Sequence, residues 1–104
     1  MPSETTMLII EVLRALPPGR VASYGGVAEI AGLPGGAGAA RQVVRVLSSM
    51  SKEYGLPWWR VVKRDGSIAL GEGSGRELQI DLLASEGVEF NGPGRVDMGR
   101  FGLR

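Results

Sequence analysis

The chain has 104 residues, a net charge of +1 and 43% hydrophobic residues, which together indicate one small folded domain. It contains no cysteine and no histidine, so a thiolate nucleophile, an imidazole base and a Ser-His-Asp arrangement are all excluded. The carboxylates are scattered, and no spacing singles out a catalytic pair. No apolar run is long enough to span a membrane, and the acidic N-terminus differs from a secretory signal. We therefore expect a cytoplasmic protein without a metal or a cofactor.

Two helices are expected near the N-terminus. Apolar residues at helical spacing follow Ser3, which is placed to cap a helix over residues 3–16, and a Pro-Pro-Gly run ends this helix. Ser23 is placed to cap a shorter helix over about 24–31, and Gly32 fits the left-handed position beyond its end. The residues of the second helix that are expected to face inward are Val27, Ala28, Ile30 and Ala31.

A third helix is expected over about residues 37–50, after a glycine-rich turn. Its core stripe is predicted to consist of Ala40, Val43, Val44 and Leu47. Arg41, Arg45 and Ser48 fall on another face of the same helix. Two helices joined by a short turn, the second carrying basic residues, fit a helix-turn-helix that faces a phosphate backbone. A helical hairpin without nucleic acid and a mixed solvated surface explain the same pattern, so these alternatives stay open.

The second half of the chain predicts a β-hairpin followed by a helix. The run WWRVV at 58–62 has β propensity, KRDG is a turn signal, and SIAL at 67–70 resumes as a second strand. Such a hairpin is the wing that follows a helix-turn-helix. After a glycine-rich loop at 71–75, residues 76–87 are expected to form the last helix, and the tail from about 91 is expected to be irregular. The apolar residues of this last helix are Leu78, Ile80, Leu82 and Leu83.

Four blocks of the sequence resemble the DNA-binding domain of the O6-alkylguanine-DNA alkyltransferases in their order and spacing. They are RVASYGGVAEIAG from Arg20, ARQVVRVL from Ala40, PWWRVVKRDGSI from Pro57 and LLASEG from Leu82. The similarity runs through about residues 5–90, which is most of the chain. It implies the fold class α/β, with residues 1–104 as a single small winged helix-turn-helix DNA-binding domain. That domain is expected to be mostly helical, with a short β-hairpin as its wing.

In that family the block at 57–61 reads Pro-Cys-His-Arg-Val, and its cysteine accepts the alkyl group. Here Trp58 stands at the cysteine position, which resembles the alkyltransferase-like proteins, in which no transfer occurs. Trp59 stands where the family has the histidine that helps to activate the thiol. The resemblance therefore implies that the protein is not an enzyme. It implies binding of O6-alkylguanine in duplex DNA through the minor groove, flipping of the base, and hand-off to nucleotide excision repair.

The partners implied are double-stranded DNA containing O6-alkylguanine and a nucleotide excision repair protein, with the chain acting as a monomer that joins the nucleoid on binding DNA. The lesion pocket is predicted to be lined by Tyr24, Trp58, Val61, Val62 and Ser74. The DNA-binding residues are predicted to be Ser23, Tyr24, Gly38, Ala40, Arg41, Gln42 and Arg45. By resemblance, Arg41 fills the gap left by the flipped base, and Tyr24 contacts the phosphate of the target nucleotide.

Three neighbours of the pocket are expected to play supporting roles. Because adjacent strand residues point to opposite faces, Trp59 is expected to pack behind Trp58. Arg60 is expected to brace the wing rather than to touch DNA, and Glu86 to act as a hydrogen-bond acceptor or a cap.

Two other classes of function compete with damage recognition. A winged-helix transcription regulator would bind undamaged DNA by its sequence. Independently of that class, the structural alternative for both Trp58 and Tyr24 is that of a core aromatic. A glycosylase that uses a carboxylate is the enzymatic alternative. The lack of histidine, cysteine and a clear acid pair argues against it.

Overall fold

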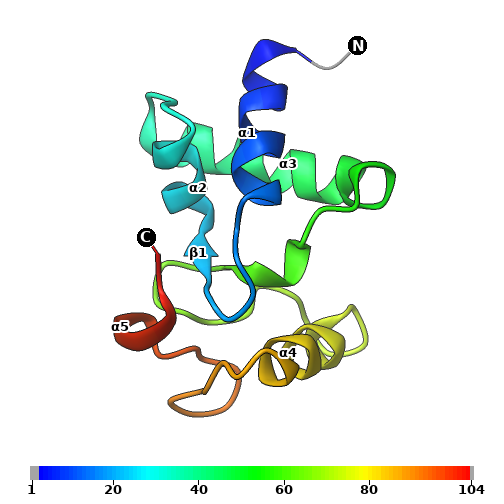
Figure 1. Ribbon diagram of the computed structural model, residues 1–104, viewed down its shortest axis with the longest axis vertical. Helices are drawn as coiled ribbons and strands as arrows, with labels where there is room; N and C mark the ends of the chain where they lie inside the picture. Colours follow the sequence, from blue (N-terminus) through cyan, green and yellow to red (C-terminus); the bar gives the residue numbers. More distant parts are fainter. Residues whose placement is uncertain (1–2, 104) are drawn as a thin grey trace.

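The computed structural model describes residues 3–103. One half of the molecule consists of α1 (Glu4–Arg14), α2 (Tyr24–Ile30) and α3 (Gly36–Tyr54), and the other half contains α4 (Arg76–Ser85) and α5 (Met98–Phe101). Between the halves lies β1 (Ala22–Ser23), as Figure 1 shows, and it pairs with β2 (Val61–Val62). None of the helices from Ser3 to Leu103 is both long and apolar enough to cross a membrane.

The helix starts predicted from the sequence are confirmed. The Ser3 hydroxyl accepts a hydrogen bond from the Thr6 amide at 3.1 Å and caps α1, and the Ser23 hydroxyl accepts one from the Gly26 amide at 2.9 Å and caps α2. Gly32 has a φ of 77°, so it occupies the left-handed position beyond α2.

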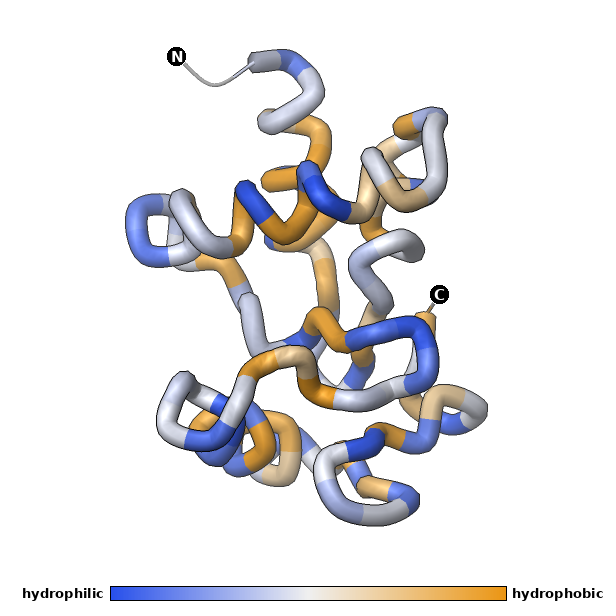
Figure 2. The backbone as a smooth tube through the Cα atoms, turned by 180° about the vertical axis from the view of Figure 1, so that it is seen from behind, coloured by the Kyte–Doolittle hydropathy of each residue, from blue (hydrophilic) through white to orange (hydrophobic). Residues whose placement is uncertain are grey.

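The third helix is longer than expected. It continues to Tyr54 and ends at Gly55, whose φ of 61° is left-handed. The helix was expected to end at about residue 50, but no glycine or proline interrupts residues 51–54 before Gly55. Figure 2 shows hydrophilic and hydrophobic turns alternating along this helix.

The predicted β-hairpin wing is wrong in its pairing. Residues 58–60 form a 3-10 turn, and β2 pairs in parallel with β1, with Ala22 opposite Val61. The turn after β2 does form, since the Lys63 amide donates to the Ser67 carbonyl at 2.9 Å. Residues 68–70 form no strand and do not pair with β2. Ile68 is turned towards the C-terminal tail instead, and its amide donates to the Gly94 carbonyl at 3.0 Å.

The C-terminal tail is more ordered than predicted, because it packs back onto the turn after β2. It contains α5, and Val21 forms a parallel bridge with Gly102. Gly66 shows how close the approach is. Its φ is 89°, and a β-carbon there would collide with the carbonyl oxygen of Val96.

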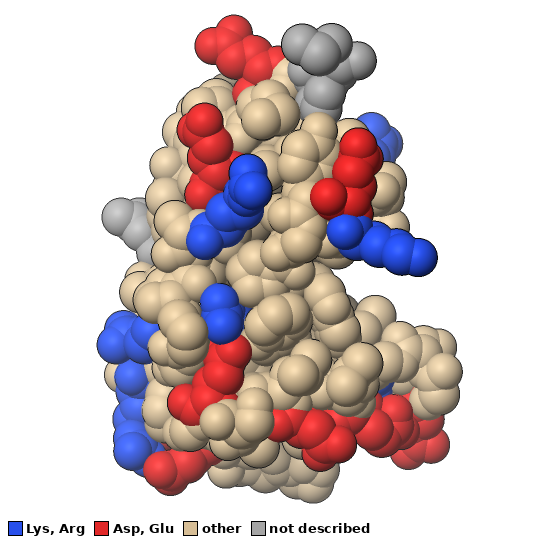
Figure 3. Space-filling model, turned by 45° about the vertical axis from the view of Figure 1, so that its right-hand side comes forward, with Lys and Arg blue, Asp and Glu red and all other residues tan. Residues whose placement is uncertain are grey.

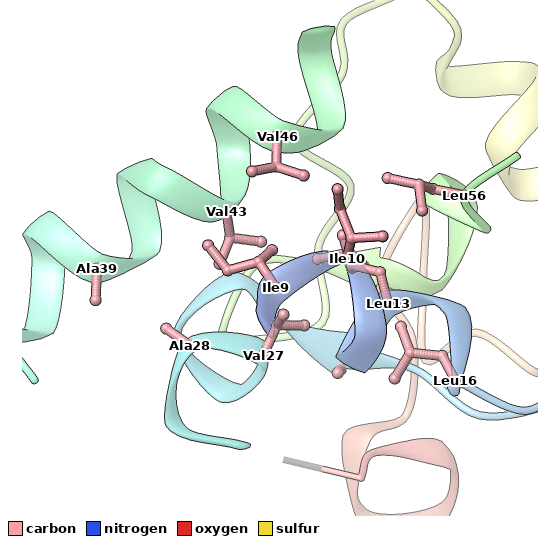
Figure 4. Packing of buried hydrophobic residues seen from close by; sticks show 12 residues of the cluster. Ile9, Ile10, Leu13, Leu16, Val27, Ala28, Ala39, Val43, Val46 and Leu56 are labelled. Atoms are coloured by element: carbon pink, nitrogen blue, oxygen red, sulfur yellow. The ribbon is translucent and has the colours of Figure 1, made fainter. Parts of the chain in front are cut away.

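Two hydrophobic clusters fill the two halves of the molecule. The first joins α1, α2 and α3, and its close packing is seen in Figure 4, where Ile9, Ile10 and Leu13 of α1 meet side chains of the other two helices. The second lies below the strands, around Leu83 and Val96. The strands alternate between the clusters with a period of two: Ala22 and Val61 face the first, whereas Val21 and Val62 face the second. The strand pair therefore connects both cores.

Two apolar side chains that were expected to face the core, Ile30 and Val44, are exposed instead, and so is the apolar Leu78 of α4. Ile30 is 45% exposed, Val44 is 44% exposed and Leu78 is 54% exposed. On α3 the buried stripe consists of Ala39, Val43 and Val46, whereas Ala40 is half-buried. The helix carries two apolar stripes, and its sequence does not indicate which of them faces α1 and α2.

Candidate functional site

A cavity of about 570 Å³ lies between the C-terminal half of α3 and the start of α4, and Trp58 forms part of its wall. Two of the exposed apolar residues, Val44 and Leu78, line it from opposite sides. Figure 3 shows the molecular surface indented between an upper and a projecting lower part. The residues that line the cavity are Tyr24, Val44, Leu47, Ser48, Ser51, Trp58, Lys63, Ala69, Leu70, Ser74, Gly75, Leu78 and Gln79.

The 3-10 turn after Pro57 holds the two tryptophans at nearly a right angle. Their ring centroids are 6.0 Å apart, and the ring planes make an angle of 89°, which is the edge-to-face arrangement. Trp58 lines the cavity, whereas Trp59 packs against the second cluster. The packing role expected of Trp59 is thus confirmed, although a 3-10 turn and not a strand separates the two rings.

Glu86, at the C-terminal end of α4, fixes this turn from behind. Its carboxylate accepts hydrogen bonds from the Trp59 indole at 2.8 Å, from the Gly19 amide at 2.9 Å and from the Arg60 guanidinium at 2.7 Å. Burial would raise the pKa of Glu86, but the hydrogen bonds from Arg60, Gly19 and Trp59 and the charge of Arg60 lower it to about 2. The carboxylate is therefore ionised at neutral pH and fully occupied as an acceptor.

Arg60 has a structural role. Besides its ion pair with Glu86, it donates to the Leu16 carbonyl at 2.8 Å and lies 5.1 Å from the Trp59 ring centroid. Its side chain is only 13% exposed. As expected, Arg60 acts as a brace, but it joins the 3-10 turn to the end of α1 and to α4 rather than supporting a wing.

Gln79 is a site residue that the sequence analysis missed. It is 2% exposed, and its amide nitrogen donates to the carbonyls of Trp59 at 3.1 Å and Val61 at 3.0 Å. It therefore ties α4 to the segment that carries Trp58. The only signal for it was a polar residue between the apolar positions of the last predicted helix.

A second hollow of about 520 Å³ adjoins the first, and Tyr24 and Lys63 line both. It lies between the N-terminal ends of α2 and α3, and it is also lined by Ser23, Ala40 and Arg64. Burial raises the pKa of Tyr24, so its phenol is neutral and can donate a hydrogen bond. Lys63 and Arg64 were missed as site residues, although the KRDG turn marked them as a basic pair.

The predicted lesion-pocket residues are only partly brought together. Tyr24, Trp58 and Ser74 line the cavity. Val61 is 1% exposed and Val62 is 0% exposed, and neither reaches the cavity wall. They support the site from the two cores instead.

Of the predicted DNA-binding residues, Ser23, Tyr24 and Ala40 line the second hollow, and the others fall on different faces of α3. Gly38 and Arg41 are exposed, and Arg41 precedes Val44 by three residues, so it lies on the helix face that leads to the cavity. Gln42 and Arg45 line a separate shallow depression together with Thr6 of α1. Between Ser3 and Leu103, no group of three or more acidic side chains is placed to hold a metal ion.

The fold agrees with comparisons against known proteins. A sequence profile described as the 6-O-methylguanine DNA methyltransferase, DNA binding domain, matches residues 4–88, and the chain belongs to this family. The resemblance inferred from the four sequence blocks is thereby confirmed.

Particular relatives are similar over most of this chain. A DNA base-flipping protein of Escherichia coli is 42% identical over 88% of this chain and 67% of its own length. One from Vibrio parahaemolyticus is 35% identical over 89% of both chains. Alkyltransferase-like protein 1 of Schizosaccharomyces pombe is 33% identical over 79% of this chain and 74% of its own.

Solved structures show the same similarity. S. pombe Atl1 in complex with damaged DNA containing O6-carboxymethylguanine superposes with a TM-score of 0.82 at 26% identity, over 100% of this chain and 99% of that chain. The O6-methylguanine methyltransferase of Mycobacterium tuberculosis gives a TM-score of 0.63 at 27% identity, over 83% of this chain and 50% of that chain.

Proposed function

We propose that this protein recognises O6-alkylguanine in duplex DNA by flipping the base into the Trp58 cavity, and that it transfers no alkyl group. The observation that carries the proposal is the place of Trp58: it occupies the acceptor position of the family motif and lines an apolar cavity beside Tyr24. A flipped base needs apolar and aromatic walls with a few polar groups at its edge, and Ser74 and Gln79 provide such groups. Relatives named DNA base-flipping proteins and a relative solved with damaged DNA support this function.

The residues at the cavity carry no group that suits alkyl transfer. The chain has no cysteine and no histidine, and an indole is a poor nucleophile. The carboxylate of Glu86 lies behind the two tryptophans, and its low pKa of about 2 makes it a weak base. The site is therefore suited to binding the alkylated base and not to repairing it.

The surroundings of the cavity supply the contacts to DNA. Arg41 projects from α3 on the face that leads to the cavity, and we infer that it enters the minor groove and fills the gap left by the base. Tyr24 is placed between the cavity and the second hollow, where its neutral phenol can donate to the phosphate of the flipped nucleotide. Recognition without repair requires a second protein, and we infer hand-off to nucleotide excision repair.

Titration of intrinsic tryptophan fluorescence tests the proposal, because the chain has two tryptophans and both lie at the site. Two duplexes are compared that differ only in one O6-methylguanine. We expect much tighter binding to the lesion duplex, together with a spectral change that is lost in Trp58→Phe and retained in Trp59→Phe. Equal affinity for both duplexes would overturn damage recognition and favour a regulator that binds undamaged DNA.

A further inference from the structure

The Trp58 cavity has a single charged side chain in its wall. Thirteen of the described residues 3–103 line the cavity. Lys63 is the only lysine, arginine, aspartate or glutamate among them. The other walls are apolar or carry neutral hydroxyl, phenol, indole and amide groups. A lone ammonium group at an otherwise neutral cavity sets the sign of its electrostatic potential.

The strand register fixes Lys63 at the cavity. Ser23 and Val62 are partners in the parallel pair, so the next residues, Tyr24 and Lys63, leave the two strands at the same edge. The backbone of Lys63 is held on both sides, because its amide donates to the Ser67 carbonyl at 2.9 Å and its carbonyl accepts from the Gly66 amide at 2.8 Å. The residue is thus placed beside the aromatic walls by the core of the fold.

The charge of Lys63 is not neutralised by an ion pair. The ion pairs Arg60–Glu86, Arg95–Asp65 and Arg100–Glu89 lie within residues 3–103, and Lys63 takes part in none of these three. Asp65, on the same turn, accepts hydrogen bonds from the amide and the hydroxyl of Ser67 and pairs with Arg95 at 3.5 Å. The charge of Lys63 contributes to the lowered pKa of Asp65, but less than the hydrogen bonds from Ser67 and the charge of Arg95 do, so the ammonium group remains available to a ligand.

We propose that Lys63 makes the cavity selective for O6-substituents that carry a negative charge, such as a carboxymethyl group, over neutral substituents of the same size. The inference rests on the proposed function, since the substituent reaches the cavity only on a flipped guanine. A carboxylate among apolar walls is costly to desolvate unless a cation compensates it, and Lys63 provides that cation. A neutral substituent gains much less from the same ammonium group.

The test compares four duplexes that differ only in the central base: guanine, O6-methylguanine, O6-carboxymethylguanine and O6-carbamoylmethylguanine. The last two are nearly the same size, and only the carboxymethyl group is charged. We expect the carboxymethyl duplex to bind about three- to tenfold more tightly than the carbamoylmethyl duplex at low salt. This ratio should fall as the salt concentration is raised.

Two variants of Lys63 and one of its neighbour complete the experiment. Lys63→Gln should bring the ratio of the carboxymethyl affinity to the carbamoylmethyl affinity close to one. Lys63→Arg should retain this ratio because the charge is kept. Arg64→Gln is the matched control: it removes the same charge from a residue that lines only the second hollow. It should weaken binding to all four duplexes and leave the ratio unchanged.

Three results would overturn the inference, and they are distinguishable. A ratio of one in the natural protein, with both lesions still preferred over guanine, would refute charge selectivity and leave damage recognition intact. If Lys63→Gln leaves the affinity ratio and the affinities unchanged, Lys63 makes no contact with the DNA. If it lowers the affinity for all four duplexes equally, Lys63 contacts the phosphate backbone and not the substituent. No preference for any lesion over guanine would refute the proposed function and the inference together.

Discussion

Replacement of Glu86 by glutamine should remove a pH-dependent part of the stability of this protein. The carboxylate of Glu86, at the end of α4, joins Trp59 and Arg60 of the 3-10 turn to Gly19, so the network connects the turn that carries Trp58 to α4 and to the chain after α1. Glutamine keeps the size of the side chain but loses the charge. Arg60, whose side chain is 13% exposed, would then have no ionic partner.

The magnitude follows from the pKa of Glu86, which is lowered from 4.5 to about 2. At about 1.36 kcal/mol per pKa unit, this corresponds to at most about 3 kcal/mol, and partial exposure to solvent reduces it to about 2 kcal/mol. Because the folded-state pKa is the lower one, this stabilisation is complete above about pH 5. It is lost as the pH falls from about 5 towards 2.

Urea unfolding followed by circular dichroism, at several pH values between 7 and 2.5, measures the effect. The natural protein should exceed Glu86→Gln in unfolding free energy by about 2 kcal/mol at pH 7, and this difference should shrink towards zero near pH 2.5. Asp81→Asn, on the exposed side of the same helix, should change the unfolding free energy by less than about 0.5 kcal/mol. A Glu86→Gln difference that stays constant over the whole pH range would refute the reasoning.

Four further variants test the site and the fold. Arg41→Ala should cost about tenfold or more in lesion affinity, whereas Arg45→Ala, the same charge change on the face towards α1, should cost less; equal losses in fluorescence titration would refute the finger assignment. Trp58→Ala should lower lesion affinity more than affinity for undamaged DNA, measured on paired duplexes. Trp58→Cys should not accept a labelled methyl group from O6-methylguanine DNA, because Trp59 stands at the activating position. Gly66→Ala should destabilise the fold by about 2 kcal/mol or more, through its left-handed φ and its collision with the tail, measured by urea unfolding.

The sequence predicts those parts of the fold that depend on neighbouring residues. Ser3 and Ser23 cap their helices through amides three residues away, and Gly32 ends α2 within its own turn. Partners that are distant in the chain were mispredicted. The segment after Gly66 pairs with the tail and not with β2, and β2 pairs with β1 across about 40 residues. Local β propensity predicts a strand but does not identify its partner.

The same distinction holds for the site. Resemblance identified Trp58, Tyr24 and Ser74, and all three line the cavity. Lys63 was missed because its place at the cavity depends on the register of a two-residue parallel ladder, which no local pattern encodes. Val61 and Val62 were assigned to the pocket, yet they point to opposite sides of β2. Val61 faces the first core and Val62 faces the second.

Trp59, at the position of the motif histidine, is held in the fold by its ring N–H. Both an imidazole and an indole have a ring N–H, and the Trp59 indole donates its own to Glu86 at 2.8 Å. Glu86 accepts this hydrogen bond from the indole and a second one from the Arg60 guanidinium. An indole cannot take up a proton near neutral pH, so Trp59 donates a hydrogen bond to Glu86 but offers no acid-base chemistry. The turn that carries Trp58 is thus held from behind by hydrogen bonds and an ion pair that need no proton transfer, which is consistent with the proposed binding of a flipped base without repair.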